Sequence, residues 1–143
     1  MGLIKELYGK KIFLDTAPLI YFMEEEDGFL PLLSDLFSPL NNCRFITSVI
    51  TLSEVLVMPL REGKTELVEQ YKEILTLSKN FDIFDINVSI AEETAKIRAS
   101  YSMKTPDAIQ LATAKYCFAD YFLTNDQRLK IFKDLNIITL ADL

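Results

Sequence analysis

The chain has 143 residues, of which 50% are hydrophobic and 25% charged, a globular composition from which we expect one domain over residues 1–143. The formal net charge is −6, so the chain lacks the basic footprint of proteins that bind nucleic acid through surface charge alone. It contains no histidine and only two cysteines, which excludes Ser-His-Asp and Cys-His catalysis and zinc sites built on histidine or several thiolates.

Short apolar runs alternate with longer amphipathic segments along the chain, which is typical of an α/β fold with a parallel sheet. Strands are expected at 11–14, 44–47, 81–84, 121–123 and 137–140. Helices are expected at 18–23, 29–37, 51–60, 64–78, 88–102, 105–118 and 126–132. The acidic run at 24–28 is expected to be a solvated turn between the first two helices.

Proline positions help to place the helix ends. Pro18 is expected to open the first helix, and Pro59 to lie in the last turn of the helix at 51–60. The run Thr105-Pro106-Asp107 indicates a helix start, with Thr105 as the N-cap, Pro106 at the first helical position and Asp107 in the first turn.

Several polar residues follow directly after expected strands. Asp15 follows the strand at 11–14, and Thr124, Asn125 and Asp126 follow the strand at 121–123. Ligand sites in open α/β sheets lie outside the carboxyl ends of the strands. These residues are therefore predicted to share one site.

Glu54 and Asp107 are two further candidates for that site. Glu54 lies in a helix that is apolar on most faces, so we expect the helix to be buried and the carboxylate to need a salt-bridge partner, a raised pKa or a metal. Asp107 can be explained by the helix dipole, and Asp126 by turn or N-cap chemistry. A single shared site explains Asp15, Glu54, Asp107 and Asp126 together better than four separate explanations.

Carboxylate oxygens without histidine or thiolate favour Mg²⁺ or Mn²⁺ over zinc or copper. Carboxylate clusters that hold such ions support phosphodiester and phosphoryl-transfer chemistry. The chain has no G-x-x-x-x-G-K-[ST] loop, so nucleotide hydrolysis of the P-loop type is not supported.

Four segments of the chain (13–20, 47–55, 105–114 and 122–126) resemble, in order and spacing, the sequence blocks of the PIN domain. The resemblance implies a three-layer α/β/α sandwich with a short central parallel sheet, and Mg²⁺- or Mn²⁺-dependent ribonuclease activity. It assigns the acidic cluster to Asp15, Glu54, Asp107 and Asp126, with Asp15 and Asp107 as the usual metal ligands. The supporting polar residues would be Thr16, Thr124 and Asn125.

The size of the chain is similar to that of VapC-type toxins of prokaryotic toxin–antitoxin pairs. That likeness implies an RNA substrate, a homodimer, and a cognate antitoxin with a segment that occupies the active-site groove. Gln110 stands where many relatives carry His, one helical turn beyond Asp107, and is expected to affect substrate contacts more than metal binding. Five cations flank the site segments and could contact phosphates or simply be solvated: Arg98, Lys104, Lys115, Arg128 and Lys130.

Cys43 and Cys117 are expected to be reduced, buried thiols of a cytoplasmic protein, since no signal peptide or membrane-spanning stretch is apparent. Two other functions stay open. One is a PIN-like module that binds RNA or a protein without cleaving. The other is a phosphatase with Asp15 as nucleophile, which is disfavoured because Ala17 stands where such enzymes carry a second Asp.

Overall fold

The computed structural model describes residues 2–24 and 28–143, so the expected turn at 24–28 lies largely outside the described residues. Its centre is a five-stranded sheet in the order β3-β2-β1-β4-β5, in which each strand runs parallel to its neighbours. The strands are β1 (Lys11–Leu14), β2 (Arg44–Ser48), β3 (Phe81–Phe84), β4 (Tyr121–Thr124) and β5 (Ile137–Thr139). The α/β class and all the expected strands are therefore confirmed, to within a residue at their ends.

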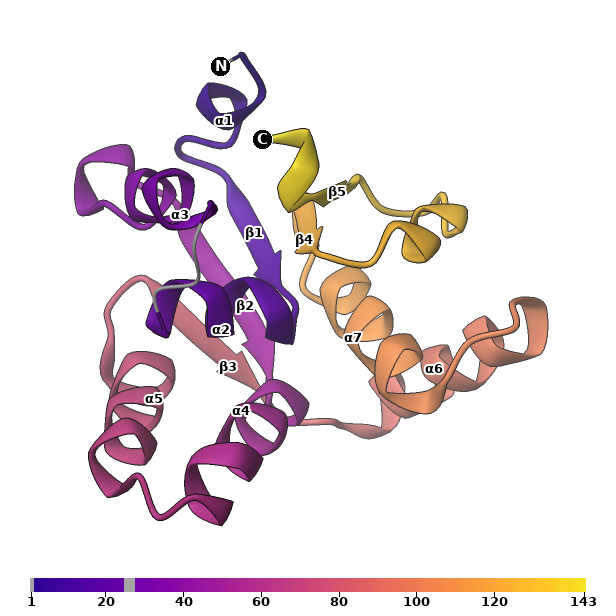
Figure 1. Ribbon diagram of the computed structural model, residues 1–143. Helices are drawn as coiled ribbons and strands as arrows, with labels where there is room; N and C mark the ends of the chain where they lie inside the picture. Colours follow the sequence, from indigo (N-terminus) through magenta and orange to yellow (C-terminus); the bar gives the residue numbers. More distant parts are fainter. Residues whose placement is uncertain (1, 25–27) are drawn as a thin grey trace.

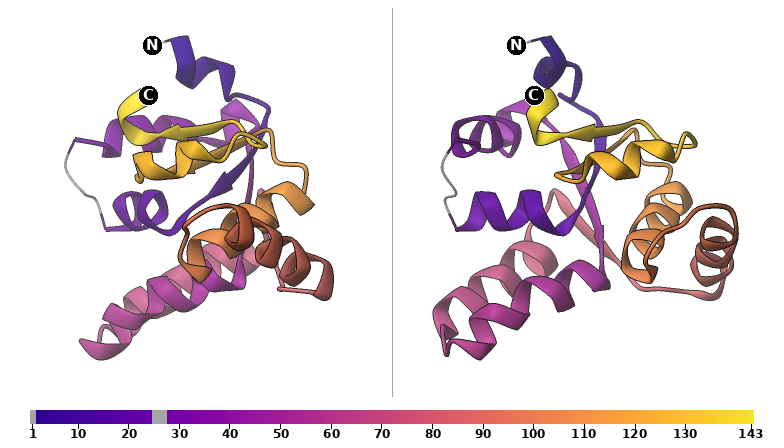
Figure 2. Two further views of the ribbon diagram at one scale, coloured as in Figure 1. Left: turned by 90° about the vertical axis from the view of Figure 1, so that its right-hand side faces the viewer. Right: turned by 45° about the vertical axis from the view of Figure 1, so that its right-hand side comes forward.

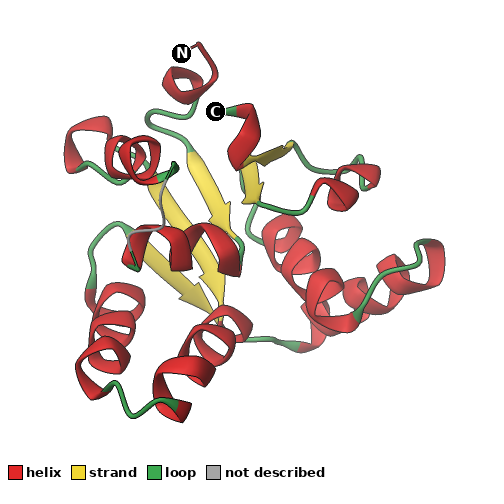
Figure 3. Cartoon of the chain, in the orientation of Figure 1, coloured by secondary structure: helices red, strands yellow, loops and turns green. Residues whose placement is uncertain are grey.

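Helices connect and cover these strands (Figures 1 and 3). The α-helices are α1 (Gly2–Glu6), α2 (Thr16–Met23), α3 (Leu30–Leu36), α4 (Val49–Arg61), α5 (Thr65–Leu77), α6 (Val88–Ser100) and α7 (Thr105–Tyr116). Short 3₁₀ helices are η1 (Pro39–Asn41), η2 (Gln127–Ile131) and η3 (Leu140–Asp142). The helix α1 was not expected, and the helix expected at 126–132 is the 3₁₀ helix η2. In residues 2–24 and 28–143, no helix is long and apolar enough to cross a bilayer.

The sheet separates two hydrophobic cores, because successive side chains of a strand point to opposite faces. Ile12 and Leu14 of β1 pack with residues of α2 to α5, whereas Phe13 packs with residues of α6 and α7. Figure 2 shows the corresponding layers, with α2 to α5 on one side of the sheet and α6 and α7 on the other. The expected three-layer α/β/α arrangement is confirmed.

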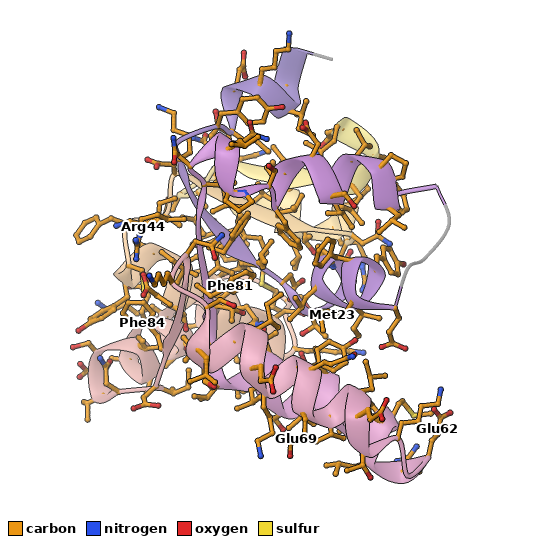
Figure 4. All side chains as sticks on the ribbon, turned by 90° about the vertical axis from the view of Figure 1, so that its left-hand side faces the viewer. Met23, Arg44, Glu62, Glu69, Phe81 and Phe84 are labelled. Carbon is orange, nitrogen blue, oxygen red and sulfur yellow. The ribbon has the colours of Figure 1, made fainter. Side chains whose placement is uncertain are left out.

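Aromatic rings fill much of the first core. Phe45 lies between Phe37 and Phe81, with ring centroids 4.6 Å and 5.1 Å away. Phe81 is buried, whereas Glu69 is exposed on α5, the helix that faces the viewer in Figure 4. The helix α5 therefore closes this side of the sheet with one apolar and one charged face.

Three helix starts differ from those expected. The helix α2 begins at Thr16 rather than Pro18, because the Asp15 carboxylate caps it by accepting a hydrogen bond from the Thr16 amide. Lys104, not Thr105, is the N-cap of α7, and it makes no side-chain capping bond. The helix α4 starts two residues early, where Ser48 accepts from the Ile50 amide. Side-chain caps at strand ends thus place the first turns of α2 and α4 directly at the sheet edge.

The end of α7 is set by Phe118, although the helix was expected to continue to that residue. Phe118 has a φ of 55°, in the left-handed region. Its amide donates to the Lys115 carbonyl at 3.2 Å, and the Ala119 amide donates to the Ala114 carbonyl at 3.0 Å. This pair of bonds is the Schellman arrangement that usually places glycine at the left-handed position.

Phe118→Gly is expected to stabilise the protein by about 1 kcal/mol, because glycine adopts positive φ without the steric cost of a side chain. The Phe118 side chain is 83% exposed, so its removal loses little packing. Urea unfolding of the two proteins measures the difference. The control Tyr116→Gly, inside the last turn of the same helix, should be destabilising; a loss of stability in Phe118→Gly as well would contradict the prediction.

Candidate metal-binding and catalytic site

The candidate site lies where the strand order reverses. The chain runs from β1 outward to β2 and β3, and then returns to place β4 on the other side of β1. Both strands end at the same edge, where the Asp15 amide donates to the Leu123 carbonyl at 3.0 Å. A crevice at such a switch point is the usual ligand site of open α/β sheets, and Asp15 and Asp126 lie beside it.

The carboxylate of Asp15 is fixed by one neighbour on α2 and one on β4. Its Oδ1 accepts a hydrogen bond from the Thr16 amide at 2.9 Å, and its Oδ2 accepts one from the Thr124 hydroxyl at 2.8 Å. Burial raises the pKa of Asp15, and these two hydrogen bonds oppose that rise while the charge of Glu54 adds to it. The carboxylate is therefore held in one orientation in surroundings that disfavour its charge.

Asp107 lies in the first turn of α7, as expected, and is half-buried. Burial raises its pKa, and the charges of Asp15 and Asp126 raise it further, whereas Arg128 and Lys104 lower it. Asp15 and Asp126 are thus near enough to Asp107 for their charges to repel its own. A cation placed among the three would relieve that repulsion.

Asp126 is already paired with a cation. It is the N-cap of η2, where Oδ1 accepts from the Arg128 amide at 3.0 Å. The Arg128 guanidinium adds a bidentate contact, with Nε 3.0 Å from Oδ1 and Nη2 2.8 Å from Oδ2. These hydrogen bonds from Arg128 hold the pKa of Asp126 below its ordinary value. The capping role expected of Asp126 is confirmed, and its ion pair with Arg128 was not foreseen.

Glu54 joins the site through Thr16, whose hydroxyl donates to the Glu54 Oε1 at 2.6 Å. The expectation that the helix around Glu54 is buried, and Glu54 with it, is wrong. The helix α4 buries Thr51, Val55 and Pro59, whereas Glu54 is exposed. Only one face of α4 is covered, so its remaining apolar residues meet solvent, and Glu54 faces the site without the burial penalty.

The three supporting polar residues have different roles in the structure. Thr16 links Asp15 to Glu54. Thr124 links Asp15 to Asp126, because its hydroxyl donates to Asp15 and accepts from the Asp126 amide at 3.1 Å. The Asn125 amide instead donates to the Tyr21 hydroxyl on α2 at 3.1 Å. Asn125 therefore ties the loop after β4 to α2 rather than contacting the acids.

A buried polar network lies beneath the acids and was missed in the sequence. Gln110 is 1% exposed; its Oε1 accepts from the Ser48 hydroxyl at 2.5 Å, and its Nε2 donates to the Thr51 hydroxyl at 2.6 Å. The Thr47 hydroxyl lies 2.7 Å from that of Thr51 and donates to the Leu14 carbonyl at 2.8 Å. The network thereby joins α7, α4, β2 and β1.

Because Gln110 is buried, it could affect substrate contacts more than metal binding, as expected of it, only indirectly. The Gln110 amide also lowers the pKa of Asp15, although its Nε2 hydrogen bond goes to Thr51. Gln110 therefore does not form part of the site surface. Through its hydrogen bonds it stabilises the end of β1, which is followed by Asp15. The spacing of Gln110, three residues after Asp107, was the available signal, but spacing alone cannot tell an inward side chain from an outward one.

The donor set suits a hard divalent cation, with Asp15 and Asp107 as the principal candidate ligands. Within the described ranges, no three Asp, Glu or Cys side chains converge closely enough to hold one ion. Mg²⁺ commonly binds proteins through one or two carboxylates and keeps several waters. Two carboxylates with oxygen donors and mutual repulsion therefore fit such an ion, with Glu54 and Asp126 close by.

The five candidate phosphate contacts divide into two groups. Lys115 pairs with Glu93 and Asp134, and Lys130 pairs with Asp142. Arg98 donates to the Met103 carbonyl. Lys104 and Arg128, in contrast, line a cavity of about 280 Å³ that also includes Asp107 and Asp126. Positive charge therefore reaches the site from two of the five expected residues.

Most of the chain matches one known protein family. The PIN domain model matches residues 12–135, a span that runs from β1 to the turn before β5 and includes all four candidate acids. The chain belongs to the PIN domain family. The resemblance found in the four sequence segments is thereby confirmed.

Solved structures with the same fold include toxins of toxin–antitoxin systems. VapBC2 from Rickettsia felis, bound to a promoter DNA fragment, has a TM-score of 0.72 at 16% identity, over 90% of this PIN domain and 98% of that chain. A toxin–antitoxin complex from Klebsiella pneumoniae has a TM-score of 0.69 at 25% identity, over 90% and 97%. VapC20 from Mycobacterium tuberculosis, a sarcin–ricin loop cleaving toxin, has a TM-score of 0.67 at 16% identity, over 84% and 93%. No curated protein matches the chain.

Gln110→Leu is expected to lower the free energy of unfolding by about 1–3 kcal/mol, because the buried Ser48 and Thr51 hydroxyls lose a hydrogen-bond partner. Urea denaturation measures the change. The matched control is Gln70→Leu on the exposed side of α5, which should change stability by less than about 0.5 kcal/mol. Equal effects of the two substitutions would contradict the role given to the network.

Asp107→Asn is expected to stabilise the PIN domain at pH 7 in the presence of a chelator. The pKa of Asp107 is raised in the folded state, so ionisation of this group opposes folding at any pH above that raised value. The advantage of Asn should shrink as the pH falls from the raised pKa towards the ordinary value of 3.8, where the carboxyl is increasingly protonated in both states.

Thermal unfolding across this pH range tests the prediction, with the exposed Asp85→Asn as control. Divalent cation should reverse the order at pH 7, since it stabilises only the protein with both carboxylates. A lower melting temperature of Asp107→Asn in chelator would show that Asp107 is not electrostatically strained.

Proposed function

We propose that this PIN domain is a Mg²⁺- or Mn²⁺-dependent endoribonuclease and the toxin component of a toxin–antitoxin pair, with the whole chain forming one domain. The observation that carries the proposal is the placement of Asp15 and Asp126 at the adjoining ends of β1 and β4, where the Thr124 hydroxyl links them, with Asp107 near enough for their charges to raise its pKa. Burial and the neighbouring acids disfavour the charged form of Asp107, which is a cost in an apo protein. The acids become useful if they bind a divalent cation that in turn contacts a polyanionic substrate.

In this proposal Asp15 and Asp107 hold the ion, and Glu54 and Asp126 complete the acidic surroundings. A bound divalent ion supplies a water of lowered pKa and offsets the charge that grows on the phosphate. Thr124 keeps the Asp15 carboxylate oriented from one side, and the Thr16 amide does so from the other. Lys104 and Arg128, at the adjoining cavity, attract the phosphates of the RNA strand.

The partners in this proposal are an RNA substrate, a second copy of the chain and a cognate antitoxin. Support for the antitoxin comes from the neighbouring folds, which include a toxin–antitoxin complex from Klebsiella pneumoniae. Formation of a stable complex with the product of an adjacent gene, with loss of RNA cleavage in that complex, is the expected result.

Purified protein is expected to cleave single-stranded RNA with Mg²⁺ or Mn²⁺ and not with a chelator. Asp107→Asn should lower the cleavage rate by about 100-fold or more, because it weakens binding of the divalent ion that would stabilise charge at the reacting phosphate. The matched control is Asp134→Asn, whose carboxylate pairs with Lys115 at the far end of α7; its rate should stay near that of the wild type.

Equal cleavage by wild type and Asp107→Asn would contradict the assignment and point to a contaminating nuclease. Absence of cleavage together with absence of Mn²⁺ binding by calorimetry would favour a non-cleaving module that binds RNA or a protein. The ion pair of Asp126 with Arg128 would be consistent with such a module, because Arg128 already neutralises one of the acids.

A further inference from the structure

A cavity opens directly beside Asp107 and Asp126 and is larger than metal binding requires. Its volume is about 280 Å³, near the lower limit of pockets that take small organic ligands. One end carries the two acids, and the rest is lined by the loop after α6 and by η2. The remaining lining residues are Tyr101, Ser102, Met103, Lys104, Arg128, Leu129 and Ile131.

The apolar walls of this cavity are held in place from both sides. Tyr101 stacks edge-on against Phe132, with ring centroids 5.5 Å apart and an interplanar angle of 72°. Its amide bonds to the Ile97 carbonyl, and the Met103 amide bonds back to the Tyr101 carbonyl at 3.0 Å. On the opposite side Leu129 is buried, so the walls do not depend on a ligand for their shape.

The exposed part of the cavity combines an apolar residue with two cations. Ile131 is 57% exposed and offers an apolar surface to a ligand in the cavity. The Arg128 side chain is 82% exposed while its guanidinium lies on Asp126, and Lys104 precedes Asp107 by three residues. A ligand that suits this lining has an apolar part and an anionic group directed towards the acids and their bound cation.

We propose that this cavity binds one unpaired nucleobase of the RNA, next to the phosphate at the acidic site; the inference rests on the proposed ribonuclease function. Unpaired bases are recognised by stacking on aromatic, apolar and guanidinium surfaces, whereas bases inside a duplex cannot reach such a cavity. The volume accommodates a single base rather than a stacked run. The cavity would therefore hold the base of the nucleotide next to the cleaved phosphate.

The test compares binding of a short single-stranded oligoribonucleotide with that of twins that carry one abasic position, scanned along the strand. Binding is measured by fluorescence anisotropy with Ca²⁺ in place of Mg²⁺, and a gel verifies that the RNA stays intact. Loss of the base at one position should weaken binding to the wild type about ten-fold. Ile131→Ser should bind the intact RNA about as weakly as the wild type binds the abasic RNA. Removal of the base should then cause no further loss of affinity in this variant.

The control Leu77→Ser changes an equally apolar residue that is 76% exposed at the end of α5, and it should keep the wild-type dependence on the base. Tyr101→Leu, verified as folded by circular dichroism, should behave like Ile131→Ser. Equal affinity for intact and abasic RNA at every position, an unchanged base dependence in Ile131→Ser, or no RNA binding at all would overturn the inference.

These outcomes are separable from failure of the proposed function, which is judged by metal-dependent cleavage in the wild type. Base-dependent binding without cleavage would support the cavity and refute the nuclease. Cleavage with no base dependence would support the nuclease and refute the cavity.

Discussion

The hydroxyl of Thr124 connects the two strand ends on which the candidate site is built. It donates to Asp15 after β1 and accepts from the Asp126 amide after β4, so one side chain sets the relation between two acids that are 111 positions apart in sequence number. Asp107 reaches the same place because α7 leads directly into β4. Glu54 arrives through Thr16, which follows Asp15. The acidic site is therefore a consequence of the parallel pairing of β1 with β4.

Local charge around the site differs from the charge of the whole protein. The net charge of −6 gives no general attraction to RNA, and Lys115 and Lys130 are held by acids elsewhere. Lys104 and Arg128 place positive charge at the cavity rim. Association with a polyanion would thus depend on short-range contacts and on bound cations more than on long-range steering.

Sequence patterns predicted the strands and the positions of Asp15, Asp107 and Asp126, because apolar runs with polar residues at their ends determine where a parallel sheet presents its functional edge. The same patterns misplaced Glu54 and Gln110. An apolar helix such as α4 does not reveal which faces its neighbours cover, and a glutamine one turn after an aspartate can point inward or outward. The Arg128–Asp126 contact depends on the tight turn of η2, which the expected regular helix would not have formed.

The candidate site takes residues from three layers of the fold, and the two helical layers have separate hydrophobic cores. Asp15 belongs to the sheet, Glu54 to the layer on one face, and Asp107 to the layer on the other, and each layer has its own core. A core substitution that lets one layer slide by a fraction of an ångström would leave the fold intact yet change the separation of the carboxylates. Variants of this protein can therefore lose the geometry of the acidic site through remote repacking, with little change in melting temperature and no altered residue near the acids.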